Sequence, residues 1–337
     1  MISMPQADHP EATVATENSR SRHLVDPELL DLLGIFPSAP ITAATLPEIR
    51  KMAREPFPVD FGTPDVPVAD SHRLVPGPEG APQVGVRIYR PEPLTGEAPC
   101  IFHIHGGGYV LGETEALAPM HRKLSADVAC VLVTVEYRLA PETHFPGNLE
   151  DCYAALAWLF GHAAELGVDA SRIGVMGESA GGGLAAGLAL LARDRGQYRL
   201  AFQHLIAPML DDRTCTTRDP NPFTGQFIWT PESNEFGWTS LLGGPPGSPN
   251  VSPYAAAARA TDVGGLPRTF ICMGALDLFL EEDLEYAHRL MRAGVPVELH
   301  VYPGAFHAFD IHATAQVAQA ARRDSRAALR RVLRGGG

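Results

Sequence analysis

From about residue 84 onward, short runs rich in β-branched residues alternate with longer stretches in which apolar residues recur every three or four positions. The first pattern is typical of buried strands and the second of helices that cover a sheet. This alternation predicts repeated βαβ units, and hence an α/β fold with a mostly parallel sheet. The expected strands occupy residues 83–90, 100–106, 130–137, 172–179, 202–208, 268–274 and 297–303. The expected helices between and after them occupy residues 149–167, 180–194, 281–294 and 314–334.

Two regions interrupt the alternation. Residues 1–65 contain only short helical patterns, at residues 27–33 and 46–54, and residues 212–253 are rich in proline and glycine. A long stretch without strand periodicity between two strands is more often functional than idle. We therefore predict that both regions contribute to a cap over a core formed by residues 66–211 and 254–337. The alternative for the insertion is a meandering surface loop, and for residues 1–22 we expect a disordered tail.

Composition excludes several classes of partner. The formal net charge of −12 argues against nucleic acid or an anionic membrane, because both require a basic surface. The five cysteines form no C-x-x-C pair, and no apolar stretch is long enough for a signal peptide or for membrane insertion. We expect a cytoplasmic protein that acts on a small, neutral substrate.

The most specific motif is the strand-to-helix junction that reads GESAG at residues 177–181. It matches G-x-S-x-G, in which the serine stands at a strained turn and the glycines let strand and helix pass closely. The helix N-terminus that follows favours negative charge developing on an attacked carbonyl group. We therefore predict that Ser179 is a nucleophile.

An alternative interpretation begins with residues 181–186, which fit the G-x-G-x-x-A pattern of dinucleotide-binding folds. Ser179 would then only cap a helix, and the chain would be a nucleotide-dependent oxidoreductase. However, the preceding strand is not the first of the sheet, and no acidic residue closes a strand about twenty residues further on. The nucleophile is the preferred interpretation, and no cofactor is expected.

Three successive glycines, in the sequence HGGGY, end an upstream strand. They leave backbone N–H groups free to point into a shared cavity, as the oxyanion of acyl transfer requires. We assign Gly107, Gly108 and Ala180, the residue after the nucleophile, to an oxyanion hole. His103 and His105 form an H-x-H pair, but no acidic residue follows at a metal-ligand spacing, so no metal is expected. The two histidines are interpreted as core and loop-bracing residues.

A nucleophile of this kind requires an acid and then a histidine, each at the carboxyl end of a later strand. Asp277 follows the strand at 268–274, and His307 follows the strand at 297–303. We predict that His307 is the general base and that Asp277 orients it, so that an ester is cleaved through an acyl-enzyme intermediate. The less favoured alternatives are Asp211 or Asp212 as the acid and His300 or His312 as the base.

The combination of HGGGYVLG, VEYRLAPETHFPG, GESAGG, ALD and YPGAFHAF resembles the bacterial hormone-sensitive-lipase-like esterases over most of residues 70–320. This resemblance implies an eight-stranded α/β-hydrolase core and a helical cap made from the N-terminal segment and the insertion after the sixth strand. It also implies carboxylesterase activity on short-chain acyl esters without a cofactor. Finally, it implies a homodimer formed through the last strand, here residues 297–301.

The chain departs from the family pattern at three places. Glu178 replaces the more common Asp, the acid turn reads Asp-Leu-Phe-Leu rather than Asp-Pro-Leu, and the insertion does not match a standard pair of cap helices. The residues predicted to line the substrate pocket are Tyr109, Phe223, Trp229 and Trp238, although the three insertion aromatics can equally form the core of the cap. Other acyl hydrolases, such as an amidase, lactonase or lipase, and a non-catalytic ligand-binding member of the fold remain as alternative functions.

Overall fold

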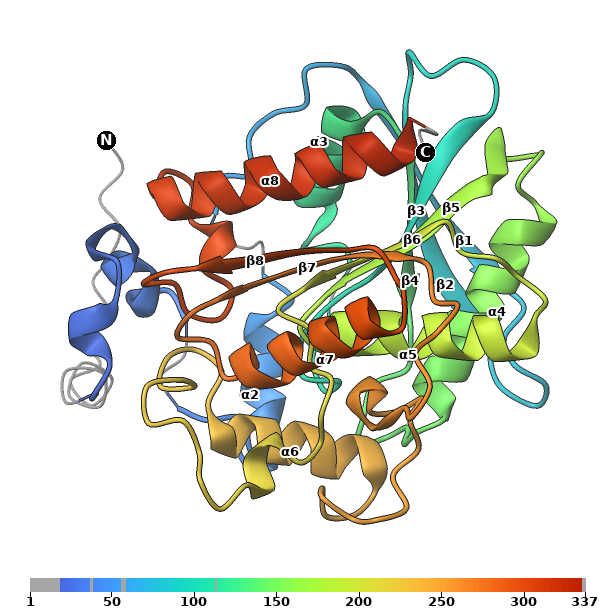
Figure 1. The fold of residues 1–337 in the computed structure, drawn as a ribbon. Coiled ribbons are helices and arrows are strands. Elements are labelled where there is room, and N and C mark those ends of the chain that lie inside the picture. The colour runs from blue at the N-terminus through green and yellow to red at the C-terminus, as the bar shows by residue number, and fades with distance from the viewer. Residues whose placement is uncertain (1–18, 37–38, 56–58, 113, 335–337) are drawn as a thin grey trace.

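Eight strands form one sheet through the middle of the molecule (Figure 1). They are β1 (Val68–Val75), β2 (Val84–Pro91), β3 (Ala98–Ile104), β4 (Val131–Glu136), β5 (Val168–Glu178), β6 (Phe202–Ile206), β7 (Arg268–Gly274) and β8 (Val297–Tyr302). The computed structural model describes residues 19–36, 39–55, 59–112 and 114–334. The strand order is β1-β2-β4-β3-β5-β6-β7-β8. Because β2 is antiparallel to β1 and β4 while all other pairs are parallel, the predicted mostly parallel sheet of an α/β protein is confirmed.

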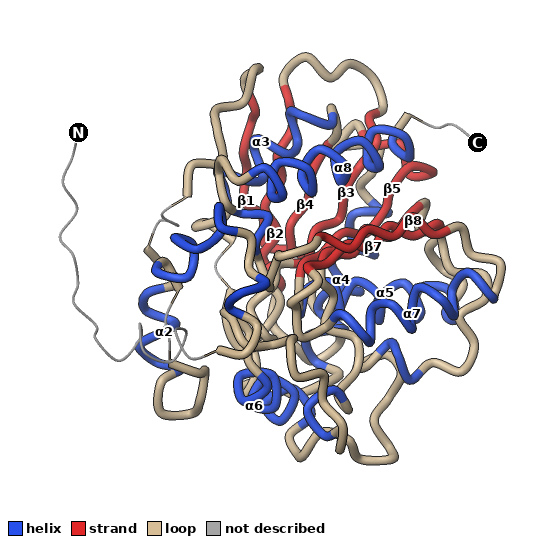
Figure 2. The backbone as a smooth tube through the Cα atoms, turned by 60° about the vertical axis from the view of Figure 1, so that its left-hand side comes forward, coloured by secondary structure: helices blue, strands red, loops and turns tan. Residues whose placement is uncertain are grey.

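Helices cover both faces of the sheet (Figures 1 and 2). One face carries α3 (Ala118–Val128) and α8 (Gln316–Leu333), and the other carries α4 (Gly147–Gly161), α5 (Ala180–Arg195) and α7 (Leu280–Arg292). Side chains alternate between the two faces along a strand. On β3, Phe102 and Ile104 belong to the large core under α4, α5 and α7, whereas Ile101 belongs to the core under α3 and α8. The central strands are buried on both faces, which explains their continuous apolar sequences.

Three elements differ from the prediction. Strand β1 was not among the seven strands read from the sequence, because it lies at an edge and most of its side chains are exposed and polar. Helix α3 was also missed, because its buried face includes His121 and Ser125 and is therefore weakly apolar. Helix α4 ends at Gly161 rather than at residue 167, since residues 162–167 form turns that lead into β5.

The N-terminal segment and the insertion lie together beyond the carboxyl ends of the central strands. The first contains η1 (Arg22–Leu24), η2 (Pro27–Gly34) and α2 (Leu46–Met52), and the second contains η3 (Thr214–Thr216) and α6 (Pro231–Leu242). The Ser19 hydroxyl donates to Gln226 Oε1 over 2.6 Å, and the Ile41 N–H donates to Ser233 Oγ over 3.0 Å. We call the two segments together the cover. Of the predicted disordered tail, residues 1–18 lie outside the described residues, whereas residues 19–22 contact the insertion.

At the opposite edge from β1, strand β8 ends the sheet. The side chain of Val301 on this strand is 41% exposed. The free edge is therefore compatible with pairing of two chains along β8, which stays a prediction. Within the described residues, no helix has the length and apolar character needed to cross a membrane.

Candidate active site

Ser179 stands at the turn between β5 and α5. Its backbone has φ 54° and ψ −123°, a conformation that is strained for a residue with a side chain. Gly177 makes this turn possible, because a Cβ atom there would lie 2.3 Å from the Gly181 carbonyl oxygen. The Ser179 N–H donates to the Ile206 carbonyl over 2.9 Å, and the Gly183 N–H donates to the Ser179 carbonyl over 3.0 Å. The serine is thus held by β6 on one side and by its own helix on the other.

The predicted acid and base meet the serine from two later strands. Asp277 lies in the turn after β7, and His307 lies in the loop between β8 and the short helix η5 (Phe309–Ile311). His307 Nδ1 is 2.8 Å from Asp277 Oδ2, and His307 Nε2 is 3.0 Å from Ser179 Oγ. Asp277 Oδ1 also accepts the Phe279 N–H over 3.0 Å. Because Nδ1–H donates to the carboxylate, Nε2 is left to accept the serine hydroxyl proton.

The glycine loop passes directly over the serine. A Cβ atom at Gly106 would lie 2.9 Å from the Glu178 carbonyl oxygen and 3.3 Å from Ser179 Cβ. Gly107 and Gly108 follow with φ 114° and 60°, values that favour glycine. Ala180 is the first residue of α5, so its N–H has no intrahelical acceptor. The structure therefore brings all three predicted oxyanion-hole residues close to Ser179.

A buried histidine supports this loop from behind. His105 Nδ1–H donates to the Gly106 carbonyl over 2.8 Å, and its ring stacks on Tyr137 with the centroids 4.3 Å apart. The Tyr137 hydroxyl in turn donates to the His105 carbonyl over 2.9 Å. Burial lowers the pKa of His105 to about 4, so the imidazole is neutral at pH 7. His105 is part of the loop's framework.

Aromatic rings from the cover and from the acid turn surround the histidine of the site. The ring of Trp229 lies 6.2 Å from that of His307, and its edge would be 2.1 Å from a Cβ atom at Gly108. Phe279 meets His307 edge-on, with ring centroids 5.3 Å apart. Ser179 and His307 are only 8% and 7% exposed. The serine and the histidine are therefore largely buried beside these rings.

The other predicted pocket residues lie in different surroundings. Tyr109 is buried, packs on Trp238 with ring centroids 5.2 Å apart, and donates its hydroxyl to the Met209 carbonyl over 3.1 Å. Trp238 itself is completely buried and belongs to the main core together with residues of the sheet. Phe223 is 45% exposed on the outside of the insertion. Of the four residues, Trp229 is the one whose ring lies beside both His307 and Gly108.

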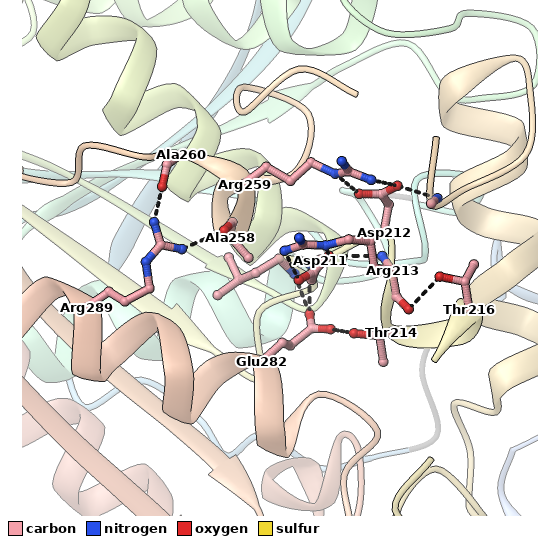
Figure 3. Close-up of polar contacts among 12 residues, drawn as sticks. Asp211, Asp212, Arg213, Thr214, Thr216, Ala258, Arg259, Ala260, Glu282 and Arg289 are labelled. Atoms are coloured by element: carbon pink, nitrogen blue, oxygen red, sulfur yellow. Dashed lines mark hydrogen bonds and ion pairs between the residues drawn. The ribbon is translucent and has the colours of Figure 1, made fainter. Parts of the chain in front are cut away.

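The alternative acids and bases have other partners. Asp211 pairs with Arg213 over 2.7 Å, and Asp212 accepts Nε of Arg259 over 2.5 Å (Figure 3). His300 Nε2 lies 3.0 Å from Glu298 Oε1 on the same strand. His312 Nε2 lies 3.0 Å from Asp31 Oδ1 of the N-terminal segment. None of these contacts reaches Ser179.

Glu282, on the first turn of α7, was not predicted from the sequence. Its carboxylate accepts the Leu210 N–H over 2.6 Å and the Asp211 N–H over 3.2 Å, and it also accepts the Thr214 hydroxyl (Figure 3). It therefore joins the helix after the acid turn to the start of the insertion. The acidic run at residues 281–283 was the only signal in the sequence, and it does not say which of its side chains accepts hydrogen bonds from the chain after β6.

We expect the change Glu282→Ala to lower the free energy of unfolding by about 2–5 kcal/mol, because two buried N–H groups lose their acceptor. Urea denaturation followed by circular dichroism measures this loss. Glu285→Ala is the matched control, since Glu285 is exposed on the same helix and its removal should change stability by less than about 0.5 kcal/mol. Equal losses in the two variants would contradict the structural role of Glu282.

The glycines at residues 181–186 are used for packing. A Cβ atom at Gly182 would lie 2.8 Å from the side chain of Pro208, and one at Gly183 would lie 2.2 Å from the Met209 carbonyl oxygen. These glycines therefore allow α5 to approach the chain that follows β6. In the described part of the chain, no group of three or more His, Cys, Asp or Glu side chains is arranged to hold a metal ion.

Comparison with known proteins identifies the family to which the chain belongs. A family model described as alpha/beta hydrolase fold matches residues 101–311, which is more than half of the chain and includes Ser179, Asp277 and His307. The chain belongs to the α/β-hydrolase family. The predicted resemblance to its hormone-sensitive-lipase-like esterases is also confirmed, because the similar proteins are esterases of this type.

Three similar proteins align over nearly their whole length. Carboxylesterase NlhH of Mycobacterium tuberculosis is 32% identical, and the alignment covers 94% of this chain and 99% of the relative. The structure of a bacterial heroin esterase is 40% identical with a TM-score of 0.83, covering 93% of this chain and 99% of that one. Esterase LipW from Mycobacterium marinum is 33% identical with a TM-score of 0.78, covering 93% and 98%. This α/β-hydrolase is therefore a carboxylic ester hydrolase.

Proposed function

We propose that this α/β-hydrolase cleaves short-chain acyl esters through a Ser179-His307-Asp277 triad and an acyl-enzyme intermediate. The observation that supports this most directly is the pair of contacts made by His307, 3.0 Å to Ser179 Oγ and 2.8 Å to Asp277 Oδ2. Together they give the serine a base and give the base a fixed tautomer.

In the first half of the reaction, Ser179 Oγ attacks the ester carbonyl carbon and its proton passes to His307 Nε2. The carbonyl oxygen becomes an oxyanion, which the N–H groups of Gly107, Gly108 and Ala180 stabilise. A single donor of this kind is typically worth about 2.7–4 kcal/mol of barrier. As the tetrahedral intermediate collapses, His307 gives its proton to the leaving alkoxide and the acyl group stays on the serine.

In the second half, water replaces the alcohol. His307 takes a proton from this water as its oxygen attacks the acyl carbon, and a second oxyanion occupies the same hole. Collapse releases the carboxylic acid and returns the proton to Ser179 Oγ. Asp277 remains ionised throughout and stabilises the imidazolium that forms twice in each cycle.

The burial of Ser179 and His307 supports a short acyl group. Trp229 closes one side of it, where its ring touches Gly108 and approaches His307. The ring is also fixed in place, because its Nε1–H donates to Asn234 Oδ1 over 3.0 Å. A long acyl chain would have to displace this ring.

The test is hydrolysis of p-nitrophenyl esters from acetate to palmitate by the wild type and by Ser179→Ala. We expect the wild type to be most active on the short chains. In Ser179→Ala, kcat should fall about 10⁶-fold, to the residual rate that the oxyanion hole supports without a nucleophile. Activity that survives in Ser179→Ala would overturn the nucleophile assignment. If the wild type cleaves no ester in the series, anilide and lactone substrates distinguish an amidase or lactonase from a ligand-binding protein of the same fold.

We expect Trp229→Leu to shift the preferred acyl chain toward greater length. Removing the indole ring opens the side of the site next to Gly108, so kcat/KM for the octanoate ester should rise at least about tenfold relative to the acetate ester. The same ester series measures the change. Phe223→Leu is the control, because Phe223 is exposed on the insertion and should leave the profile unchanged. An unchanged profile in Trp229→Leu would show that another part of the cover limits the acyl group.

A further inference from the structure

A chain of hydrogen bonds crosses three central strands just below the serine. His103 on β3 stands in register with Thr134 on β4, and its Nδ1 is 3.1 Å from Thr134 Oγ1. On the other side, His103 Nε2 is 2.9 and 3.1 Å from the two carboxylate oxygens of Glu178 on β5. Since a carboxylate can only accept, Nε2–H donates to Glu178, while Nδ1 shares the second hydrogen bond with the threonine hydroxyl.

Two members of this hydrogen-bond chain, His103 and Glu178, lie on segments that lead directly to the two halves of the site. Strand β3 continues into the glycine loop, whereas Glu178 is the last residue before the nucleophile. The backbones of these segments also touch, because a Cβ atom at Gly106 would be 2.9 Å from the Glu178 carbonyl oxygen. The Glu178–His103 pair therefore adds a side-chain link, next to the backbone pairing of β3 with β5, between the oxyanion loop and the serine turn.

The surroundings of the pair make its hydrogen bonds strong. His103 is completely buried, and its ring meets that of His121 edge-on at 4.5 Å. Burial holds the pKa of His121 well below its usual range, so this neighbour adds no positive charge. On the other side, burial and then the charge of Glu178 raise the pKa of Asp310 to about 6. Hydrogen bonds to charged groups are stronger than those between neutral groups.

We propose that Glu178 is a positioning residue for ester hydrolysis, which it serves by holding Ser179 and the glycine loop in register through His103. This inference depends on the proposed role of Ser179. An oxyanion hole works only when its donors lie at hydrogen-bond distance from the oxygen of the tetrahedral intermediate, and that oxygen is placed by the nucleophile. A small shift of one strand end against the other would weaken both N–H contacts at once.

The geometry also accounts for the length of the side chain at residue 178. Because His103 is in register with Met176, Glu178 lies diagonally across from it, two residues further along β5 and on the same face of the sheet. The carboxylate must therefore reach back toward His103. A side chain shorter by one methylene group would not make both contacts without a shift of the backbone.

The experiment measures kcat and KM on p-nitrophenyl acetate for Glu178→Gln, His103→Leu and the double variant, per site counted by active-site titration. We expect each single variant to lower kcat by about ten- to a hundredfold, since small misplacements of reacting groups have effects of this size, with KM within about twofold. The double variant should lose no more than the worse single variant, because the two residues act as one unit. His103→Gln, which keeps a donor near the carboxylate, should recover part of the rate.

Glu298→Gln provides the matched control, because Glu298 makes a similar carboxylate–histidine contact with His300 on β8, away from the triad. It should leave kcat unchanged. If Ser179→Ala is inactive but Glu178→Gln has wild-type kcat, the positioning role is wrong and the proposed function stands. The same holds if the loss in the double variant equals the sum of the losses in the two single variants. If Ser179→Ala retains activity, both fail. Because the rates are counted per titrated site, a fraction of misfolded protein does not obscure these outcomes.

Discussion

Replacing Asp277 by Asn should lower kcat by about 10⁴-fold without unfolding the protein, the size of loss seen when the acid of a serine protease triad is amidated. The asparagine keeps the shape of the side chain but places an N–H donor or a neutral oxygen against His307 Nδ1. The ring can then adopt the tautomer that carries its proton on Nε2, where it cannot accept a proton from Ser179. The buried position of Asp277 and its contact with the Phe279 N–H hold the amide in the same place.

Steady-state hydrolysis of p-nitrophenyl acetate measures this loss, and thermal unfolding reports whether the fold is kept. Asp211→Asn is the informative control, because Asp211 was the alternative acid and its carboxylate pairs with the exposed Arg213. We expect its kcat to stay within about threefold of the wild type, as for a surface ion pair. A larger loss in Asp211→Asn than in Asp277→Asn would reverse the assignment of the acid.

Gly107→Ala should lower kcat by about 100- to 1000-fold, which corresponds to the loss of an oxyanion-hole donor. Gly107 has φ 114°, and an added Cβ atom would lie 2.3 Å from the backbone oxygen of Leu111. A backbone atom cannot move aside as the end of a side chain can. The loop must therefore take another path, and its N–H groups turn away from the oxyanion.

Two measurements separate this effect from simple destabilisation. Binding of a boronic acid, whose tetrahedral adduct with serine resembles the intermediate, should weaken in parallel with kcat, as expected for a transition-state analogue. Gly80→Ala is the control, because Gly80 also has a positive φ of 75° but has open space around it. This variant should lose stability by about 1 kcal/mol and keep its kcat. Unchanged boronate affinity in Gly107→Ala would remove the loop from the oxyanion hole.

The sequence predicted those parts of the fold that are buried on both sides. The inner strands have apolar runs because helices cover both faces, whereas β8 was also predicted although it is a half-buried edge strand. Strand β1 escaped notice because its exposed edge position selects polar residues. Ser179, Asp277 and His307 could be chosen because the fold fixes their order along the chain and their places after strands. The structure brings these three side chains within hydrogen-bond distance of one another.

Other parts of the site depend on register and helix phase, which local sequence does not encode. Glu282 is one of three consecutive acidic residues, and only the rotation of α7 against the chain after β6 decides that it is the one that accepts the Leu210 N–H. Similarly, the partner of Glu178 follows from the pairing of β3 with β5. The aromatic residues of the insertion do not recur at a regular helical or strand spacing. The sequence therefore could not show that Trp229 lies at the site while Phe223 is exposed.

The contacts that close the cover have a consequence for the order of events during synthesis. Ile41 and Ser233 are 192 residues apart in the chain, and at roughly 5–20 residues per second a ribosome needs roughly 10–40 s to make the second after the first. For that interval Ile41 and Leu46, which end up in the main core, have no finished surface to pack on. His307 emerges later still, 128 residues after Ser179. A nascent chain thus carries its proposed nucleophile through the synthesis of a further 128 residues before the proposed base is made. Over a longer interval, the N-terminal segment lacks the part of the chain that completes its binding surface.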